Sequence, residues 1–546
     1  MRVSELFVKC LENEGVEYIF GVPGEENIDF LEALKESEIE FITTRHETGA
    51  AFMAGVYGKL TGKPGVCLGT LGPGATNLLT GVAEANMDKT PLIAITGQAG
   101  LEQQHKKSHQ FYDLISMFKP VTKWNTSIRD KDIVPEVVRK AFQQAVSEKP
   151  GAAHIELPED IAELEVEGTL QEPWANKMLT RALDKAIDDA AQAIDEAENP
   201  IILVGNGVTR MRASEPLRRF VEKIRAPFTS TFMGKGAITY EHPQNLQTVG
   251  LQEKDHIVCG IDKADLIITV GFDFAEYSPS AWNPDGKRQI IHIDTQPAEV
   301  DMCYPIEVSV VGDIVENLSQ LTEKVNAREK MAPFFEKLRN EIMEDLAEHE
   351  EDISYPMKPQ KIAADLRAVL DDDAILLSDV GAHKMWLARY FHCIKPNTCL
   401  ISNGFASMGI ALPGAIGAKL AFPDKKVVAV AGDGGFLMTV QELETMVRLK
   451  LSIVVVVWTD NRYGLIEWKQ MNEYDRSSSI TFENPDIVQL AKAFGAEGMK
   501  VLRAEEFKPL LERAFELEKP VIIDCPVDFK ENVRLTERLG NIICSN

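Results

Sequence analysis

Short runs of β-branched and apolar residues alternate with longer helical patterns along this chain of 546 residues. Among the apolar runs are GVCLGTLGPG, IILVGNG, LIITVGFD, VVAVAGDGG and IVVVVWTD. Because strands joined by helical crossovers pair in parallel, the alternation predicts α/β domains with mainly parallel sheets flanked by helices. A chain of this length exceeds what one hydrophobic core usually supports, so about three domains are expected.

Two polar stretches that contain proline interrupt the alternation, at 165–185 and 328–358. Such stretches are typical of linkers, and we therefore expect three α/β domains at about 1–165, 185–325 and 360–530. The first and third domains share a local plan of strand, glycine-rich turn, helix and strand. An internal duplication and a generic βαβ unit explain this plan equally well.

The excess of acidic over basic residues limits the kinds of partner that the chain can bind. It has 84 Asp and Glu residues against 58 Lys and Arg, which gives a formal charge of −26. This charge repels nucleic acid and anionic membranes, so we expect neither as a partner. No stretch reaches the ~20 apolar residues of a membrane span, and the amino terminus lacks the apolar core of a secretion signal. We therefore expect a cytoplasmic protein that acts on a small molecule.

Two aspartates in the third domain follow neighbouring predicted strands. Asp433 follows VVAVAG and Asp460 follows IVVVVWT, with a helix expected over about 437–450. A right-handed crossover would bring both carboxylates to one edge of the sheet. Three glycines there let the backbone approach a ligand closely: Gly432, Gly434 and Gly435. Because Mg²⁺ binds through carboxylates together with phosphate oxygens, the pattern predicts a magnesium diphosphate site; the alternative is that the aspartates cap turns.

Glu47 lies in RHETGAAFMAGVYG, at the start of a predicted helix in the first domain. The small residues that follow it allow another surface to pack closely, so Glu47 can be buried. A buried carboxyl group can stay protonated or share a proton with a ring nitrogen. The alternative is an ordinary acidic residue that the helix dipole favours at this position.

Four of these segments together resemble a known family. GDGG at 432–435, TDN at 459–461, RHETGAAFMA at 45–54 and ISNGFASMGIALPGAIGA at 401–418 are similar to motifs of the thiamine diphosphate enzymes of the acetolactate synthase type. The resemblance extends over nearly the whole chain. It implies a pyrimidine-binding domain, a central domain and a diphosphate-binding domain, in that order.

The resemblance also implies roles for single residues. Glu47 would bond the pyrimidine N1′ of a cofactor held mainly by a partner subunit, which requires a homodimer or homotetramer with the active site at the subunit interface. Met408 would support the bent cofactor. Asp433 and Asp460 would bind Mg²⁺ through their side chains, and Arg462 would bind it through its backbone carbonyl.

Within the family, two stretches resemble the catabolic acetolactate synthases. SHQFYDLISMFKPVTKWN at 108–125 places His109 beside Gln110, and both are candidates for orienting substrate oxygens. GFDFAEYSPSAWN at 271–283 lacks the Arg-Phe-Asp-Asp-Arg sequence of the flavin-containing relatives, so we expect no FAD. Lys469 stands where biosynthetic enzymes that favour 2-ketobutyrate have Trp, which favours pyruvate as acceptor.

The implied reaction is decarboxylation of pyruvate followed by condensation with a second pyruvate, giving 2-acetolactate and CO2. Three alternatives stay open: another 2-keto acid decarboxylase or carboligase, a flavin-containing acetohydroxyacid synthase or pyruvate oxidase-like enzyme, and an inactive regulatory paralogue. The turn GVPGEEN carries Glu25 and Glu26, where the family's pocket tends to be uncharged. If either side chain points into the site, it would disfavour an anionic substrate.

Overall fold

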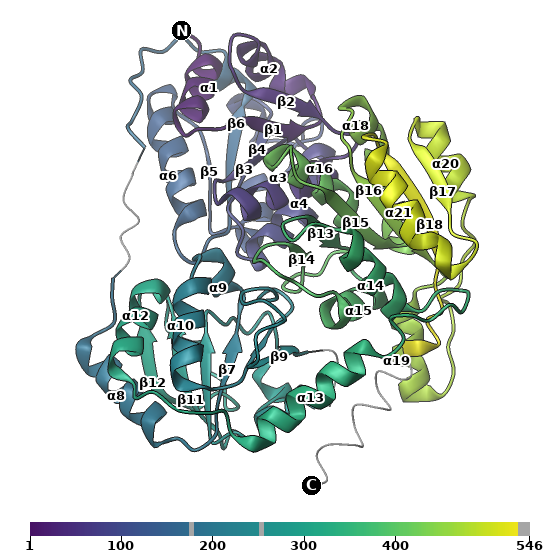
Figure 1. The fold of residues 1–546 in the computed structure, drawn as a ribbon. Coiled ribbons are helices and arrows are strands. Elements are labelled where there is room, and N and C mark those ends of the chain that lie inside the picture. The colour runs from purple at the N-terminus through teal and green to yellow at the C-terminus, as the bar shows by residue number, and fades with distance from the viewer. Residues whose placement is uncertain (174–179, 251–255, 533–546) are drawn as a thin grey trace.

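Three parallel sheets with helices on their faces make up the protein (Figure 1). The computed structural model describes residues 1–173, 180–250 and 256–532. Each sheet has six strands, which confirms the predicted α/β class. Each sheet also lies inside one of the three expected domain ranges, although the exact boundaries stay predictions. Residues 174–179 of the expected linker at 165–185 lie outside the described residues.

The N-terminal sheet has the strand order β2-β1-β3-β4-β6-β5. Its strands are β1 (Tyr18–Gly21), β2 (Glu40–Thr43), β3 (Gly65–Gly69), β4 (Leu92–Gln98), β5 (Trp124–Ser127) and β6 (Ala152–Pro158). The helices around it are α1 (Val3–Asn13), α2 (Ile28–Leu34), α3 (Glu47–Thr61), α4 (Pro73–Met87), α5 (Leu114–Phe118), α6 (Val134–Val146) and α7 (Glu159–Ala162).

The C-terminal sheet has the order β14-β13-β15-β16-β18-β17, so each of its strands has an equivalent at the same place in the N-terminal sheet. Its strands are β13 (Ile375–Ser378), β14 (Cys399–Ile401), β15 (Val427–Gly432), β16 (Val454–Thr459), β17 (Glu497–Lys500) and β18 (Val521–Pro526). Its helices are α14 (Pro359–Val369), α15 (Ala382–Tyr390), α16 (Ala411–Ala421), α17 (Asp433–Met438), α18 (Glu442–Arg448), α19 (Gly464–Tyr474), α20 (Ile487–Phe494) and α21 (Phe507–Glu516). The identical order extends the predicted similarity of the two domains from one βαβ unit to a whole sheet.

The central sheet has a different order, β12-β11-β10-β7-β8-β9. The chain adds β8 and β9 on one side of β7 and then adds β10, β11 and β12 on the other side. Its strands are β7 (Pro200–Val204), β8 (Phe228–Ser230), β9 (Asn245–Thr248), β10 (Leu266–Val270), β11 (Gln289–Asp294) and β12 (Ile306–Val311). Its helices are α8 (Asp184–Glu196), α9 (Asn206–Arg210), α10 (Ser214–Ile224), α11 (His256–Lys263), α12 (Ile314–Lys324) and α13 (Pro333–Ala347). This order is that of the dinucleotide-binding folds.

Helices α3 and α16 join the N- and C-terminal domains (Figure 1). A Cβ atom on Gly417 of α16 would lie 2.2 Å from the carbonyl oxygen of Met53 in α3, so only glycine allows this approach. On the other side of α3, a Cβ atom on Gly81 would lie 2.4 Å from Cβ of Ala51. The small residues after Glu47 therefore allow the close packing that the sequence predicts.

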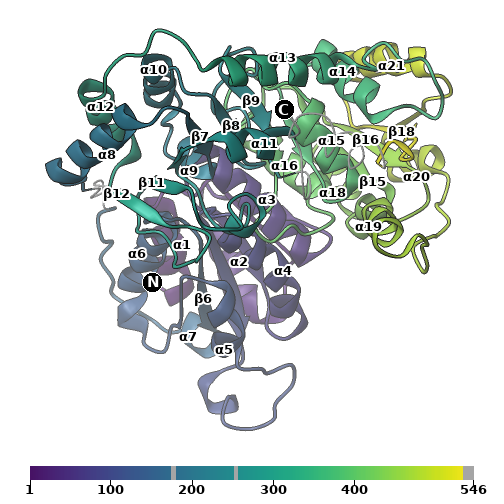
Figure 2. The ribbon, with the colours of Figure 1, turned by 90° about the horizontal axis from the view of Figure 1, so that it is seen from below.

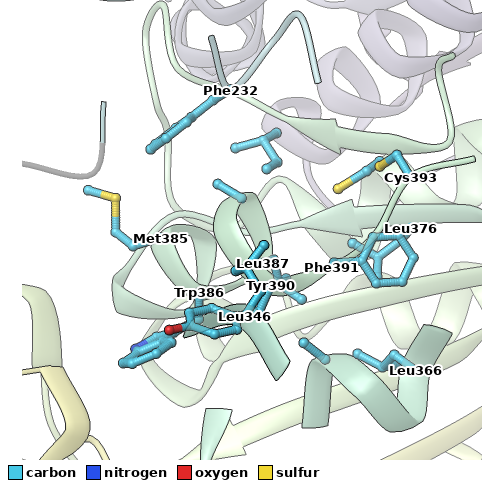
Figure 3. Packing of buried hydrophobic residues seen from close by; sticks show 14 of the residues in the cluster. Phe232, Leu346, Leu366, Leu376, Met385, Trp386, Leu387, Tyr390, Phe391 and Cys393 are labelled. Carbon is cyan, nitrogen blue, oxygen red and sulfur yellow. The ribbon is translucent and has the colours of Figure 1, made fainter. Parts of the chain in front are cut away.

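A second core joins the central and C-terminal domains (Figure 3). Helix α15 contributes Met385, Trp386, Leu387 and Tyr390 to the side chains that Figure 3 labels. Phe232 of the central domain and Leu346 of α13 belong to the same cluster. Because both interfaces bury apolar side chains, the three domains pack as one body.

Within the described residues, none of the helices is long and apolar enough to cross a membrane.

Candidate active site

Asp433 and Asp460 lie together at the carboxyl edge of the C-terminal sheet. Strands β15 and β16 pair in register, with Gly432 opposite Trp458, so the two aspartates follow adjacent strand ends. Oδ2 of Asp433 accepts hydrogen bonds from the main-chain N–H of Asp460 at 3.0 Å and of Asn461 at 2.8 Å. The structure therefore brings together the two carboxylates that the sequence predicted to share an edge.

The carboxylate of Asp460 is largely buried and forms an ion pair with Arg462. Its Oδ2 atom is buried and accepts no hydrogen bond, and Nε of Arg462 lies 3.7 Å from it, which is too far for a hydrogen bond. Burial and the negative charge of Asp433 raise the pKa of Asp460 to about 8. A cation at this point would supply the missing partner.

The segment between the two aspartates differs from the predicted single helix over 437–450. Helix α17 begins at Asp433 itself and ends at Met438, and α18 begins only at Glu442. Between them the hydroxyl of Thr439 donates a 2.8 Å hydrogen bond to the carbonyl of Gly409, a residue from a distant loop. This tertiary contact accompanies the break, and a local helical pattern does not reveal it.

His383 of α15 faces the segment 432–435, here called the glycine turn, which contains the last residue of β15 and the first three residues of α17. A Cβ atom on Gly432 would lie 3.2 Å from Nδ1 of His383, and Nε2 of the ring is buried without a hydrogen-bond partner. Burial lowers the pKa of His383 to about 3, so the ring is neutral and has a free polar atom for a ligand. A single His in SDVGAHKMW carries no motif of its own, so the sequence alone does not reveal this residue.

Asp379, which directly follows β13, is the second site residue that no sequence motif marks. Its carboxylate accepts hydrogen bonds from the main-chain N–H groups of Gly409 at 2.8 Å and of Ala411 at 3.1 Å. A Cβ atom on Gly435 would lie 2.6 Å from Oδ1 of Asp379. Burial raises the pKa of Asp379 to about 6. Asp379 thus connects the glycine turn to the loop that carries Met408, which is half-buried.

Glu47 is the first residue of α3 and its side chain is 8 % exposed. The side-chain amide of Asn77, in α4, donates a 2.9 Å hydrogen bond to Oε2 of Glu47. Beneath the start of α3, Glu442 of α18 accepts a hydrogen bond from the main-chain N–H of Arg45. Burial raises the pKa of Glu442 to about 7. The predicted burial of Glu47 is confirmed, and its catalytic role stays a prediction.

His109 and Gln110 lie in the exposed segment between β4 and α5, which projects from the N-terminal domain (Figure 2). Gln110 has a positive φ of 55° and packs against Gly72, where a Cβ atom would lie 2.8 Å from its carbonyl oxygen. Gly72 immediately precedes α4. Gln110 is therefore placed at the end of α4 that also carries Asn77.

Glu26 lies on the same domain, where its carboxylate accepts a hydrogen bond from the hydroxyl of Thr70. A Cβ atom on Gly97 would lie 3.1 Å from Cβ of Glu26. Glu26 is thus anchored to Thr70, which follows β3, and packs against Gly97 in β4.

A cavity of about 800 Å³ opens beside Asp460. Among the residues that the structure describes, its lining consists of Pro356 and of positions between 459 and 532. Glu47, Gln110 and the other predicted residues of the N-terminal domain do not reach it within one chain. Of the predicted residues of the C-terminal domain, Asp460 and Arg462 line this cavity, whereas Met408, Asp433 and the three glycines do not.

The donor set at the sheet edge fits a magnesium diphosphate. In the described part of the chain, no group of three or more His, Cys, Asp and Glu side chains converges as a metal site. A Mg²⁺ ion held by Asp433 and Asp460 would therefore need other oxygens, and phosphate oxygens are its usual additional ligands. The glycine turn and the free Nε2 of His383 offer such a diphosphate close contact and a polar partner.

The chain matches three known domain families, one in each of its three domains. Three domain families match consecutive blocks: the thiamine pyrophosphate enzyme N-terminal TPP binding domain over residues 1–117, the central domain over 187–321, and the C-terminal TPP binding domain over 379–525. The chain therefore belongs to the thiamine pyrophosphate enzymes. Thiamine pyrophosphate and thiamine diphosphate are two names for the same cofactor.

Individual relatives show which type of thiamine pyrophosphate enzyme the chain is. The chain is 38% identical to the acetolactate synthase of Bacillus subtilis over 98% of this chain and 94% of the relative. It is 35% identical to the catabolic acetolactate synthase of Raoultella terrigena, over 98% and 97% of the two chains. It is 32% identical to the large subunit of acetolactate synthase isozyme 2 of Escherichia coli, over 98% and 97%. Within its class the chain is of the acetolactate synthase type, as the motifs predict.

Proposed function

We propose that this protein is a thiamine diphosphate- and Mg²⁺-dependent acetolactate synthase, which decarboxylates pyruvate and condenses the product with a second pyruvate to give 2-acetolactate and CO2. The observation that carries the proposal is the set of unsatisfied groups around the glycine turn. Oδ2 of Asp460 and Nε2 of His383 are both buried without a hydrogen-bond partner, beside a turn that a diphosphate can approach. The names of the relatives supply the reaction.

In this proposal, the side chains of Asp433 and Asp460 and the backbone carbonyl of Arg462 hold the Mg²⁺ ion. The turn through Gly432, Gly434 and Gly435 holds the diphosphate, and Met408 supports the cofactor. When bound, thiamine diphosphate supplies a nucleophilic ring carbon and an electron sink for loss of CO2.

Glu47 has the task of holding a proton at the pyrimidine N1′ atom. Its near-complete burial keeps competing water away from the carboxyl group. The hydrogen bond from Asn77 fixes the position of Oε2, which leaves Oε1 for the ring nitrogen. Gln110 and His109 orient substrate oxygens from their projecting segment.

The active site is shared between two subunits in this proposal. Glu47 and the segment with Gln110 lie in the N-terminal domain, whereas the cavity beside Asp460 is lined by the C-terminal domain and Pro356. A second copy of the chain would bring its N-terminal domain to this cavity. We therefore propose a homodimer or homotetramer in the cytoplasm, with pyruvate as the small-molecule substrate.

The central domain supports a flavin-free enzyme. Dinucleotides place their pyrophosphate at the start of the helix that follows the first strand of such a sheet. Here the carboxylate of Glu276 occupies that position, since both of its oxygens lie 3.0 Å from the main-chain N of Asn206, the first residue of α9. The hydroxyl of Thr231 also donates to Glu276. A flavin pyrophosphate would have to displace this buried carboxylate.

The test is to incubate the purified protein with thiamine diphosphate, Mg²⁺ and pyruvate, without FAD, and to identify the product by NMR. Acetolactate is the expected product. Acetaldehyde instead would make the protein a decarboxylase, and a requirement for FAD would make it a flavin-dependent relative. Unconsumed pyruvate would contradict the proposal and favour another 2-keto acid or the inactive paralogue.

A further inference from the structure

The loop over residues 402–411, here called the Met408 loop, is held by the N-terminal domain of the same chain. Glu84 of α4 is 3 % exposed, and its Oε2 accepts a 2.9 Å hydrogen bond from the main-chain N–H of Ser407. The hydroxyl of Ser402 donates to Oε1 of the same carboxylate. One buried side chain therefore fixes two points of the loop on either side of its midpoint.

Asp88, which follows α4, holds a third point. Its Oδ1 accepts a 2.9 Å hydrogen bond from the main-chain N–H of Gly404. On the opposite side of the loop, Asp379 holds Gly409 and Ala411. The loop contains a residue in the left-handed region, Ala406 with φ of 59°, a conformation that persists only where surrounding contacts impose it.

The other end of α4 reaches Glu47. Asn77 and Glu84 are seven residues apart, which places them on the same face of the helix. Asn77 donates to Glu47, and Glu84 holds Ser407, the neighbour of Met408. A single helix thus contacts the loop proposed to support one cofactor and the carboxyl group proposed to act on the cofactor of the neighbouring subunit.

We propose that Glu84 is a positioning residue for thiamine diphosphate, which holds the Met408 loop in its cofactor-binding conformation and makes α4 the rigid connection between that loop and Glu47. This inference rests on the proposed function, because that function gives Met408 its contact with the cofactor. Glu84 itself touches neither cofactor nor substrate in this proposal.

Two substitutions at Glu84 distinguish the effect of its hydrogen bonds to the loop from the effect of its negative charge. Glu84→Ala removes both hydrogen bonds to the loop. Glu84→Gln can keep them, because its amide oxygen accepts from Ser407 and its amide N–H can donate to the hydroxyl oxygen of Ser402. Ser402→Ala removes one hydrogen bond and serves as a milder variant if Glu84→Ala does not fold. Glu14→Gln is the control, since Glu14 is a buried carboxylate of the same domain that pairs with Arg139, remote from the loop.

Two measurements are made on the full chain. Calorimetric titration of the apoprotein with thiamine diphosphate in excess Mg²⁺ should give a Kd raised about tenfold in Glu84→Ala, several-fold in Ser402→Ala, and less than threefold in Glu84→Gln. Glu14→Gln should lower Tm without changing Kd. Hydrogen exchange of the apoprotein should be faster across 402–411 in Glu84→Ala and unchanged in Glu14→Gln.

Unchanged cofactor affinity and unchanged loop exchange in Glu84→Ala would overturn the proposal, and so would equal loss of affinity in Glu14→Gln. Failure of the proposed function is recognised separately in the wild-type protein, either by a product other than acetolactate or by the absence of thiamine diphosphate binding. In that event the exchange data on the apoprotein still decide whether Glu84 orders the loop.

Discussion

The main-chain N–H of Asp460 donates a 3.0 Å hydrogen bond to the carboxylate of Asp433, which ties the ends of two parallel strands together. Oδ2 of Asp460 is itself buried and accepts no hydrogen bond. Two carboxylates in such proximity repel each other unless a cation lies between them.

Asp460→Asn should therefore weaken the binding of Mg²⁺. An amide keeps the shape of the side chain and removes its negative charge, so the Mg²⁺ concentration for half-maximal activity should rise about tenfold, or roughly 1.4 kcal/mol. Activity titrated against Mg²⁺ at saturating thiamine diphosphate measures the effect. If the wild-type and variant curves coincide, Asp460 only caps its turn.

Glu47→Gln should abolish most of the activity and leave the fold intact. The amide cannot exchange a proton with the pyrimidine ring, and general acid–base groups contribute about 10²–10⁴-fold in rate. Pyruvate consumption measures the loss, and circular dichroism with thermal unfolding checks the fold. Activity within threefold of wild type would remove Glu47 from the mechanism.

His383→Ala should weaken cofactor binding more than it changes the apoprotein. The lost interaction is a hydrogen bond from a neutral ring to a charged diphosphate, and such bonds contribute roughly 1.5–3 kcal/mol, so the Kd should rise at least tenfold. Calorimetry with thiamine diphosphate and Mg²⁺ provides the measurement. A Kd equal to that of the wild type would show that Nε2 of His383 meets something other than the cofactor.

Gly417→Ala should destabilise the junction of α3 and α16, because the added methyl group would lie 2.2 Å from the carbonyl oxygen of Met53. Overpacking of this kind costs about 1–3 kcal/mol. Gly55→Ala is the matched control in α3, since its Cβ would lie 3.8 Å from Cβ of Ala85, an ordinary contact. Chemical denaturation should order the three proteins with Gly417→Ala lowest and Gly55→Ala equal to or above wild type.

Glu442→Gln should reduce the dependence of stability on pH. Burial raises the pKa of Glu442 from 4.5 to about 7, so the native state binds more protons than the unfolded state between these values. The contribution of Glu442 to the stability of the folded state is therefore complete below pH 4.5 and is lost as the pH rises to 7. Tm measured at pH 5 and pH 8 should fall less in the variant than in the wild type. Equal falls would mean that Glu442 titrates normally.

The fold class and the meeting of Asp433 with Asp460 could be predicted from the sequence, because strand alternation and the handedness of crossovers are local rules. The burial of Glu47 could be predicted from the small residues beside it. His383 and Asp379 could not, since their importance comes from burial against Gly432 and Gly435, which lie some fifty residues away in the chain. The break after α17 likewise coincides with a long-range hydrogen bond, from Thr439 to Gly409, which a local pattern does not show.

The repeated strand order has a consequence for stoichiometry. Asp433 follows β15 directly as the first residue of α17, whereas the residues that follow β3 are Thr70, Leu71, Gly72 and Pro73, none of which is acidic. Although the two sheets are built alike, only the C-terminal one has carboxylates after both its third and fourth strands. Each chain should therefore bind one metal ion and one cofactor, and a dimer should contain two of each, in sites related by its twofold axis.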